Sequence, residues 1–290
     1  MAKLSVGIIG TGFGAKVHAP AFRTIPGVEV MAIAGQDRRK AALAGQTLGI
    51  PTVHDSWQQL IDDEKVEAVV VAVPPSAHFD VVTAALRAGK HVLCEKPSGV
   101  DAGQAARMWE LARASDRVCM VDYMFRMAPE RVRLKELLDG HEIGRIIRVT
   151  VEWTVRGRAA GNSAWSWQFD PSFGGGVLFA FGAHVVDYLQ WLVGPVRSVA
   201  ARLSTRGGPA QFVPMDRPVA ADTLDAMLLL EGDIPVSITV SNATPGGRGH
   251  WLTMYGERGA LLVGNANLAD TVSGTRLYQS DMTTGALRDT

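Results

Sequence analysis

The sequence has little cysteine and no net charge. Cys94 and Cys119 are the only thiols in 290 residues, and neither has a second cysteine or a histidine at metal-ligand spacing. This excludes a disulfide framework, and the sequence predicts no metal site. Lysine plus arginine and aspartate plus glutamate both number 29, so there is no basic field to bind nucleic acid or an anionic membrane. We therefore expect a small-molecule substrate.

The sequence also lacks a leader pattern and an uninterrupted apolar run. Residues 1–10 enter a strand pattern without the apolar core and cleavage site of a signal peptide. The longest apolar stretch, residues 177–193, contains His184, Asp187 and Gln190, which argues against a membrane span. These features predict a cytoplasmic protein that does not bind membranes.

The chain changes character near residue 122. Before it, short β-branched runs alternate with amphipathic helix-length segments, which is typical of a doubly wound parallel sheet. After it, longer alternating strands predominate, with helices expected only near 130–139 and 177–193. We predict an α/β Rossmann-type dinucleotide-binding domain over residues 1–122. An α+β domain with a large, mostly antiparallel open sheet should follow over 123–290, for substrate binding and oligomerisation, with residues 204–220 as a surface loop.

A glycine-rich stretch, "GIIGTGFGA" at residues 7–15, follows the first predicted strand and opens a helix. Gly10, Gly12 and Ala15 occupy the positions of the G-x-G-x-x-G/A motif, in which glycine allows a tight turn and close approach of a pyrophosphate. The helix amides then face the phosphates. The strand before and the helix after distinguish this stretch from an ordinary glycine turn. The predicted phosphate loop comprises Gly10, Thr11, Gly12, Phe13, Gly14 and Ala15.

The end of the second predicted strand, "AIAGQDRRK" at residues 32–40, bears on the choice of cofactor. Gly35 stands where an acid would bind the ribose hydroxyls of NAD. Asp37 is equally readable as the cap of the next helix. We expect Gln36, Arg38 and Arg39 to contact the cofactor and to favour NADP over NAD; the alternative is a solvated, charged helix start.

Three longer segments carry a resemblance to a known family. They are "VVVAVPPSAHFDVVTAALRAGKHVLCEKPSG" (69–99), "DYMFRMAPERVRLKELL" (122–138) and "WSWQFDPSFGGGVLFAFGAHVVDYLQWLVGP" (165–195). With their E-K-P tripeptide and glycine-led helix, they resemble the Gfo/Idh/MocA family of sugar-type oxidoreductases over essentially the whole chain. The resemblance implies NAD(P)-dependent hydride transfer to a sugar, polyol or related cyclic hydroxyl compound, at a site between the two domains. It also implies cofactor contacts from Pro74, Pro75, His78, Glu95 and Lys96.

Lys96 and His184 are the candidate catalytic residues. Lys96 directly follows an apolar strand, where doubly wound sheets bind their ligands. Hydride transfer needs one group for the hydroxyl proton and a second to hold the oxygen. In the family the residue four positions before this histidine is often aspartate, whereas here it is Ala180. Asp170 or Asp187 could supply the carboxylate, or Lys96 and His184 could act alone; a buried structural histidine is the plain alternative.

Several expectations remain open on the sequence alone. Trp165 and Trp167 suit stacking on a sugar ring as well as core packing, and with Asp170 and His184 they are the candidate substrate contacts. Two alternatives stay open: a cofactor-binding regulator or sensor without turnover, which Ala180 favours, and an NAD-dependent glycosidase, an activity known in the family. We expect a homo-oligomer that pairs through the open sheet, and the chain stops before the C-terminal helix that is usual in the family.

Overall fold

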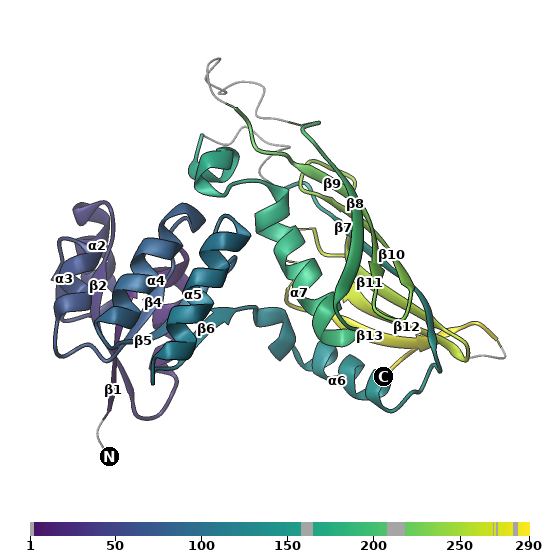
Figure 1. The fold of residues 1–290 in the computed structure, drawn as a ribbon, viewed down its shortest axis with the longest axis horizontal. Coiled ribbons are helices and arrows are strands. Elements are labelled where there is room, and N and C mark those ends of the chain that lie inside the picture. Colours follow the sequence, from purple (N-terminus) through teal and green to yellow (C-terminus); the bar gives the residue numbers. More distant parts are fainter. Residues whose placement is uncertain (1–2, 158–164, 208–217, 269, 271, 281–283) are drawn as a thin grey trace. The chain divides into compact units, whose positions relative to one another are not determined.

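The computed structural model describes residues 3–157, 165–207, 218–268, 270, 272–280 and 284–290. The chain divides into two compact units, Met1–Asp122 and Tyr123–Thr290 (Figure 1). Most of the segment predicted to be a surface loop, residues 208–217, lies outside the described residues.

The first unit contains a six-stranded parallel sheet. Its strands run in the order β3-β2-β1-β4-β5-β6, which is the order of a dinucleotide-binding fold. Successive residues of β4, such as Val69 and Val70, belong to different hydrophobic clusters, so both faces of the sheet are buried. The predicted doubly wound sheet is therefore confirmed. The strands are β1 (Leu4–Ile9), β2 (Val28–Ala34), β3 (Thr52–His54), β4 (Ala68–Val71), β5 (His91–Glu95) and β6 (Cys119–Asp122).

Three helices of the first unit, α2, α3 and α5, begin at side-chain caps. Asp37, Ser56 and Asp101 each accept a hydrogen bond from a backbone amide in the first turn of the helix that follows. The helix after the glycine loop instead begins as a π-helical turn, a feature often found at functional sites. The helical elements are η1 (Gly14–His18), α1 (Ala19–Arg23), α2 (Arg38–Leu48), α3 (Trp57–Asp62), η2 (Pro75–Ala77), α4 (His78–Arg87) and α5 (Ala102–Ala114).

The second unit is built on an eight-stranded sheet in the order β14-β13-β12-β11-β7-β10-β9-β8. Among the described strands of this sheet only the β7–β10 pair is parallel, so the predicted mostly antiparallel sheet is confirmed. Sequence analysis missed β13 and β14. The strands are β7 (Ile146–Thr154), β8 (Val196–Ser204), β9 (Thr223–Leu230), β10 (Ile234–Ser241), β11 (Gly249–Gly256), β12 (Gly259–Asn265), β13 (Arg276–Ser280) and β14 (Leu287–Asp289).

Two helices, α6 (Pro129–Asp139) and α7 (Ala183–Leu192), lie on one face of this sheet (Figure 1). Leu134 of α6 and Tyr188 of α7 are fully buried in one cluster with Val149 and Leu252 of the strands. The short turns of this unit are η3 (Met124–Met127), η4 (Trp167–Phe169), η5 (Pro171–Phe173) and the π-helical η6 (Leu178–Gly182).

One helical segment, Pro171–Leu192, is long and apolar enough to cross a membrane by length and composition. Half of its apolar window is buried inside the structure, and Tyr188 and Leu189 are inaccessible to solvent. A core helix of a soluble protein passes the same test, and the burial of α7 against the sheet is typical of one.

Candidate functional site

The glycine loop has the shape of a phosphate cradle. Gly10 has a φ of 129°, and its amide donates to the Ala34 carbonyl oxygen at 2.8 Å. A Cβ on Gly10 would lie 2.1 Å from the carbonyl oxygen of Ala72, so the loop is pinned between β2 and β4 and only glycine fits. A Cβ on Gly12 would meet nothing within 4 Å. The open backbone at Gly12 therefore fits the approach of a dinucleotide pyrophosphate.

The other residues of this loop divide between surface and core. Phe13 is exposed, whereas Gly14 and Ala15 are buried. A Cβ on Gly14 would lie 2.9 Å from the Ile8 side chain. Small residues at 14 and 15 thus let η1 pack closely on β1, as the motif requires.

Position 35, at the end of β2, has no room for a side chain because Thr11 of the glycine loop lies against it. A Cβ at this position would lie 2.6 Å from Cγ2 of Thr11. Asp37 is the cap of α2, since its carboxylate accepts from the amides of Arg39 and Lys40 at 2.9 and 3.2 Å. No carboxylate therefore stands at position 35 to select ribose hydroxyls.

The two predicted arginine contacts differ in their surroundings. Arg38 Nε lies 2.6 Å from Asp55 Oδ1 on the surface. Arg39 is exposed and has no carboxylate partner within the described ranges; Gln36 beside them is exposed as well. Arg39 is thus the better placed of the two to meet an additional phosphate.

His78 holds the loop after β4 against the E-K-P segment. It is fully buried, with Nδ1 at 2.7 Å from the Pro97 carbonyl oxygen and Nε2 at 2.9 Å from that of Val73. Burial lowers the pKa of His78. Sequence analysis placed His78 in the cofactor contacts with Pro74 and Pro75. The structure gives both ring nitrogens to the backbone, so His78 orients the segment that carries Lys96; the Lys96–Pro97 peptide bond is cis.

Lys96 follows directly on β5, next to two carboxylates. Glu95 of β5 and Asp122 of β6 are paired in register, so both side chains stand at the carboxyl end of the sheet. Burial lowers the pKa of Lys96, and the charges of Glu95 and Asp122 oppose this. Burial and the neighbouring Glu95 raise the pKa of Asp122. The arrangement offers a desolvated amine beside an acidic pair, which suits proton transfer.

His18 completes this group, and sequence analysis missed it together with Asp122. Its Nε2 lies 2.7 Å from Glu95 Oε1 and 3.8 Å from Asp122 Oδ2. The three side chains offer ligand atoms within 4.8 Å of one another, but the shortest separation is that of a hydrogen bond, and Lys96 already supplies positive charge. The only signal in the sequence was the position of these two residues. His18 ends the first turn after the glycine loop, and Asp122 ends a parallel strand.

His184 lies in the second unit, in an aromatic setting. It is 6% exposed, and its ring centroid is 4.8 Å from that of Phe125 and 6.0 Å from that of Tyr123, both nearly perpendicular. Ala180, in the π-helical turn before α7, is exposed. The position where the family often has aspartate therefore faces solvent in this unit, whereas the histidine is buried.

The two carboxylates proposed as substitutes both accept hydrogen bonds within the second unit. Arg126 donates to both oxygens of Asp187, through Nε at 2.9 Å and Nη2 at 2.5 Å. This hydrogen bonding raises the pKa of Arg126. Asp170 accepts from the amide and hydroxyl of Ser172 at 2.9 and 2.6 Å, and so caps η5. Asp187 and Asp170 thus both have structural roles.

The indoles expected to contact substrate lie just before the three glycines. Trp165 is half-buried with its ring 5.9 Å from Phe169, and Trp167 is 39% exposed. A Cβ on Gly175 would lie 2.6 Å from the Trp167 carbonyl oxygen. The glycines therefore allow the start of the helix to pack against this backbone, and Trp167 retains an accessible ring.

A buried cation supports the aromatic group around His184. Arg131 is 1% exposed, with its guanidinium carbon 4.7 Å from the Phe125 ring centre and 4.3 Å from that of Tyr188. Its Nη2 lies 3.4 Å from Nε2 of His250, whose ring stacks on Trp153 at 3.9 Å. Because arginine can only donate, that nitrogen of His250 is an acceptor. This packing fixes Phe125 beside His184.

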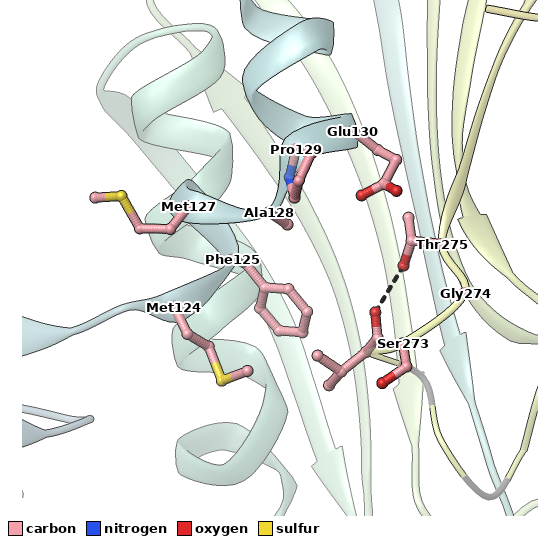
Figure 2. Close-up of a pocket in the computed structure, with 10 residues that line it drawn as sticks. Met124, Phe125, Met127, Ala128, Pro129, Glu130, Ser273, Gly274 and Thr275 are labelled. Carbon is pink, nitrogen blue, oxygen red and sulfur yellow. Dashed lines mark hydrogen bonds between the residues drawn. The ribbon is translucent and has the colours of Figure 1, made fainter. Parts of the chain in front are cut away.

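A cavity of about 370 Å³ lies next to this group, at the start of α6. Met124, Phe125 and Met127 line one side, and Ser273 and Thr275 lie across from them (Figure 2). Thr275 Oγ1 donates to the Val272 carbonyl oxygen at 3.0 Å, which holds that loop. None of the residues predicted for the site lines this cavity.

Comparison with known proteins identifies the family. The model of the oxidoreductase family with an NAD-binding Rossmann fold matches residues 4–123, and that of the GFO/IDH/MocA C-terminal domain matches 132–262. An uncharacterised oxidoreductase of Synechocystis is 37% identical over 95% of this chain and 75% of its own length. A D-xylose 1-dehydrogenase (NADP⁺) of Haloferax volcanii is 33% identical over 69% of this chain and 61% of its own length.

A solved structure agrees with these matches. Levoglucosan dehydrogenase in complex with NADH and levoglucosan superposes with a TM-score of 0.88 at 26% identity, over 99% of this chain and 80% of that protein. The fold, the glycine cradle and the matches over both units lead to one conclusion: the chain belongs to the Gfo/Idh/MocA family of NAD(P)-dependent oxidoreductases.

Proposed function

We propose that this protein transfers hydride between a nicotinamide cofactor and the carbinol carbon of a sugar, polyol or related cyclic hydroxyl compound. The observation that carries the proposal is Lys96, a desolvated amine beside Glu95 and Asp122 in the unit that holds the open cradle at Gly12. When bound there, the nicotinamide cofactor supplies the acceptor or donor of the hydride. The remaining chemistry falls to residues of the chain.

Lys96 and His184 have separate roles in the proposed reaction. In alcohol oxidation the substrate O–H bond breaks and its proton passes to Nζ of Lys96. The C–H bond of the carbinol carbon breaks as well, its hydride would pass to the bound cofactor, and the carbon–oxygen bond becomes a carbonyl. Burial lowers the pKa of Lys96, which increases the fraction of neutral amine that can accept this proton. His184 holds the oxygen through its ring, whose orientation the packing of Phe125 fixes. In carbonyl reduction the proton moves the other way.

The substrate class rests on two lines of support. The compared relatives are named for D-xylose and levoglucosan, which are a sugar and an anhydrosugar. Trp167 offers an accessible indole and Trp165 a half-buried one, and such rings stack on the apolar faces of sugars. A regulator without turnover is the second candidate, favoured by the exposed Ala180.

A panel of sugars and polyols, each mixed with NADP⁺ or NAD⁺, tests the proposed function. We expect at least one compound to increase the absorbance of reduced nicotinamide. Binding of cofactor and sugar without any absorbance change would favour the regulator. Sugar hydrolysis with tightly retained cofactor and no net change would instead identify the glycosidase alternative.

We expect NADPH to bind more tightly than NADH, because no acid stands at Gly35 and Arg39 is exposed beside it. Arg39→Ala should weaken NADPH binding about tenfold, the effect of losing one charge-assisted hydrogen bond, and should leave NADH binding unchanged. Arg38→Ala is the matched comparison, with a smaller effect because Arg38 pairs with Asp55. Calorimetric titration measures both, and equal affinities of the native protein for NADPH and NADH would contradict the assignment.

We also propose a cytoplasmic homo-oligomer that pairs through the sheet of the second unit. The face away from α6 and α7 carries a row of paired residues, Met227, Ser237, Thr150 and Thr253. This row is mostly hydroxyl-bearing rather than apolar, with Met227 68% exposed at one end. A second copy of the face would bury these side chains and satisfy their hydroxyl groups. The adjacent row of the same face carries Asp225, Thr239 and Glu152.

Light scattering should give a mass at least twice the 31.0 kDa of the chain. Thr253→Arg places a charge at the end of this row opposite Met227 and should produce monomers. Leu43→Arg, at a 65% exposed position of α2, is the control and should leave the mass unchanged. A monodisperse native monomer would exclude the proposed pairing.

A further inference from the structure

The group formed by His18, Glu95, Lys96 and Asp122 contains two bases and two acids from three elements of the first unit. His18 ends η1, the π-helical turn that follows the phosphate loop. Glu95 and Lys96 lie at the end of β5, and Asp122 ends β6. The His18 side chain is nearly inaccessible, so its 2.7 Å hydrogen bond to Glu95 is made away from bulk water, where such bonds are strong.

The contacts of His18 determine how strongly the charges of Glu95 and Asp122 act on Lys96. Glu95 Oε1 is bound by His18, while Glu95 Oε2 accepts from the Lys96 amide at 3.3 Å. Asp122 lies beyond hydrogen-bond range of His18, at 3.8 Å. The edge of the Phe13 ring, with its centroid 5.2 Å from that of His18, packs against the imidazole. A hydrogen bond from His18 to Glu95 draws negative charge toward the imidazole and away from the lysine.

The ionisable groups that face Lys96 come from four elements of the first unit. Glu95 comes from β5 and Asp122 from β6, and both favour the ammonium form. His78 comes from α4; the positive charge of Lys96 contributes to lowering its pKa, after burial. His18 comes from η1, opposite the carboxylates. Of these groups, only His18 can weaken the effect of the Glu95 charge on Lys96 while both carboxylates remain in place.

We propose that His18 is a positioning residue which, through its hydrogen bond to Glu95, keeps Lys96 poised to exchange a proton. The effect on turnover rests on the proposed function, whereas the effect on the proton affinity of Lys96 does not. Without the imidazole, both carboxylates act fully on Lys96, and its ammonium form persists to higher pH. The phosphate loop and the proton-transfer lysine are thereby coupled, because the short helical turn that directly follows the cradle carries His18.

Competitive acetylation tests this without a substrate. The full-length protein is labelled with acetic anhydride across a pH series, and mass spectrometry of the peptide that contains Lys96 gives the midpoint of its reactivity. His18→Leu should raise the midpoint by about one pH unit, the size of effect that a charge within about 4–6 Å exerts. Asp122→Asn should lower it, because a carboxylate that favours the ammonium form is lost. His18→Gln, which retains a donor for Glu95, should restore most of the native value.

The outcomes are decisive whether or not a substrate is known. An unchanged midpoint in folded His18→Leu, or shifts of the same sign in His18→Leu and Asp122→Asn, would overturn the proposal. A shift of the native midpoint on adding EDTA would also overturn it, since a bound cation would then set the charge. If His18→Leu does not fold, a midpoint that Asp122→Asn fails to lower, or a midpoint of His18→Gln far from the native value, would overturn the proposal. With a substrate in hand, the rising limb of kcat/KM against pH for alcohol oxidation should move with the labelling midpoint, because the neutral amine accepts the proton. A native protein without turnover but with these shifts would refute the proposed function alone.

Discussion

Lys96→Ala should lower turnover about 100-fold or more, the loss expected when a proton-transfer group is removed. Affinity for the cofactor should change little, because the binding cradle is made of backbone at Gly10 and Gly12. Steady-state kinetics and cofactor titration of the same preparations separate the two effects. Native turnover of alcohol should rise with pH through the lowered pKa of Lys96, because the neutral amine is the acceptor; the variant should lose this rise.

Lys90→Ala is the matched control for this variant. Lys90 is a buried lysine just before the other end of β5, and its Nζ donates to the carbonyl oxygens of Asp63 and Val66 at 2.9 and 2.6 Å. Its loss should lower the free energy of unfolding by about 1–3 kcal/mol, since buried acceptors lose their donor, and leave kcat of the folded protein intact. Equal kcat in native protein and Lys96→Ala would show that the lysine does not transfer the proton.

His184→Ala should also reduce kcat about 100-fold, since it removes a group that holds the reacting oxygen. The aromatic packing of Phe125 around the ring indicates that orientation is built into the second unit. His54→Ala, which removes a histidine paired with Asp63 in the first unit, is the control and should retain kcat. Unchanged kcat in folded His184→Ala would assign this histidine to structure alone.

Restoring the carboxylate of the family tests the departure at Ala180. Ala180→Asp places a negative charge one turn before His184, at an exposed position where aspartate has room. The charge favours the protonated imidazole, so carbonyl reduction below neutral pH should become severalfold faster. No gain in Ala180→Asp together with a large loss in Asp187→Asn would show that Asp187 already fills this role, despite its bonds to Arg126.

Local sequence patterns were sufficient to predict the regular alternation of strands and helices in the first unit. Apolar strands that alternate with amphipathic helices predicted the parallel sheet, and glycine spacing predicted the phosphate loop. β13 and β14 were missed because Leu277 is the only fully buried residue in them and β14 is exposed throughout, so neither strand has an alternating apolar pattern. The first turn of the helix near 177–193 is π-helical, which residue periodicity does not reveal.

The site was harder to predict because its contacts join distant segments. His18 reaches Glu95 across 77 residues, and Arg131 reaches His250 across 119. No local motif encodes such pairs; they follow from strand order and from helix packing on a sheet. At Gly35 a single residue has two explanations. Sequence analysis related it to the choice of cofactor, whereas in the structure the methyl group of Thr11 also requires a glycine there.

The most direct test of the account follows a deuterium atom. A sugar from the panel, deuterated at its carbinol carbon, is incubated with NADP⁺ and excess protein for a single turnover, and the cofactor is analysed by mass spectrometry. The account predicts that deuterium appears in the reduced nicotinamide. In Lys96→Ala the rate of this transfer should be lower by a factor of about 100 or more. Sugar and cofactor that both bind while all deuterium stays on the sugar would contradict it.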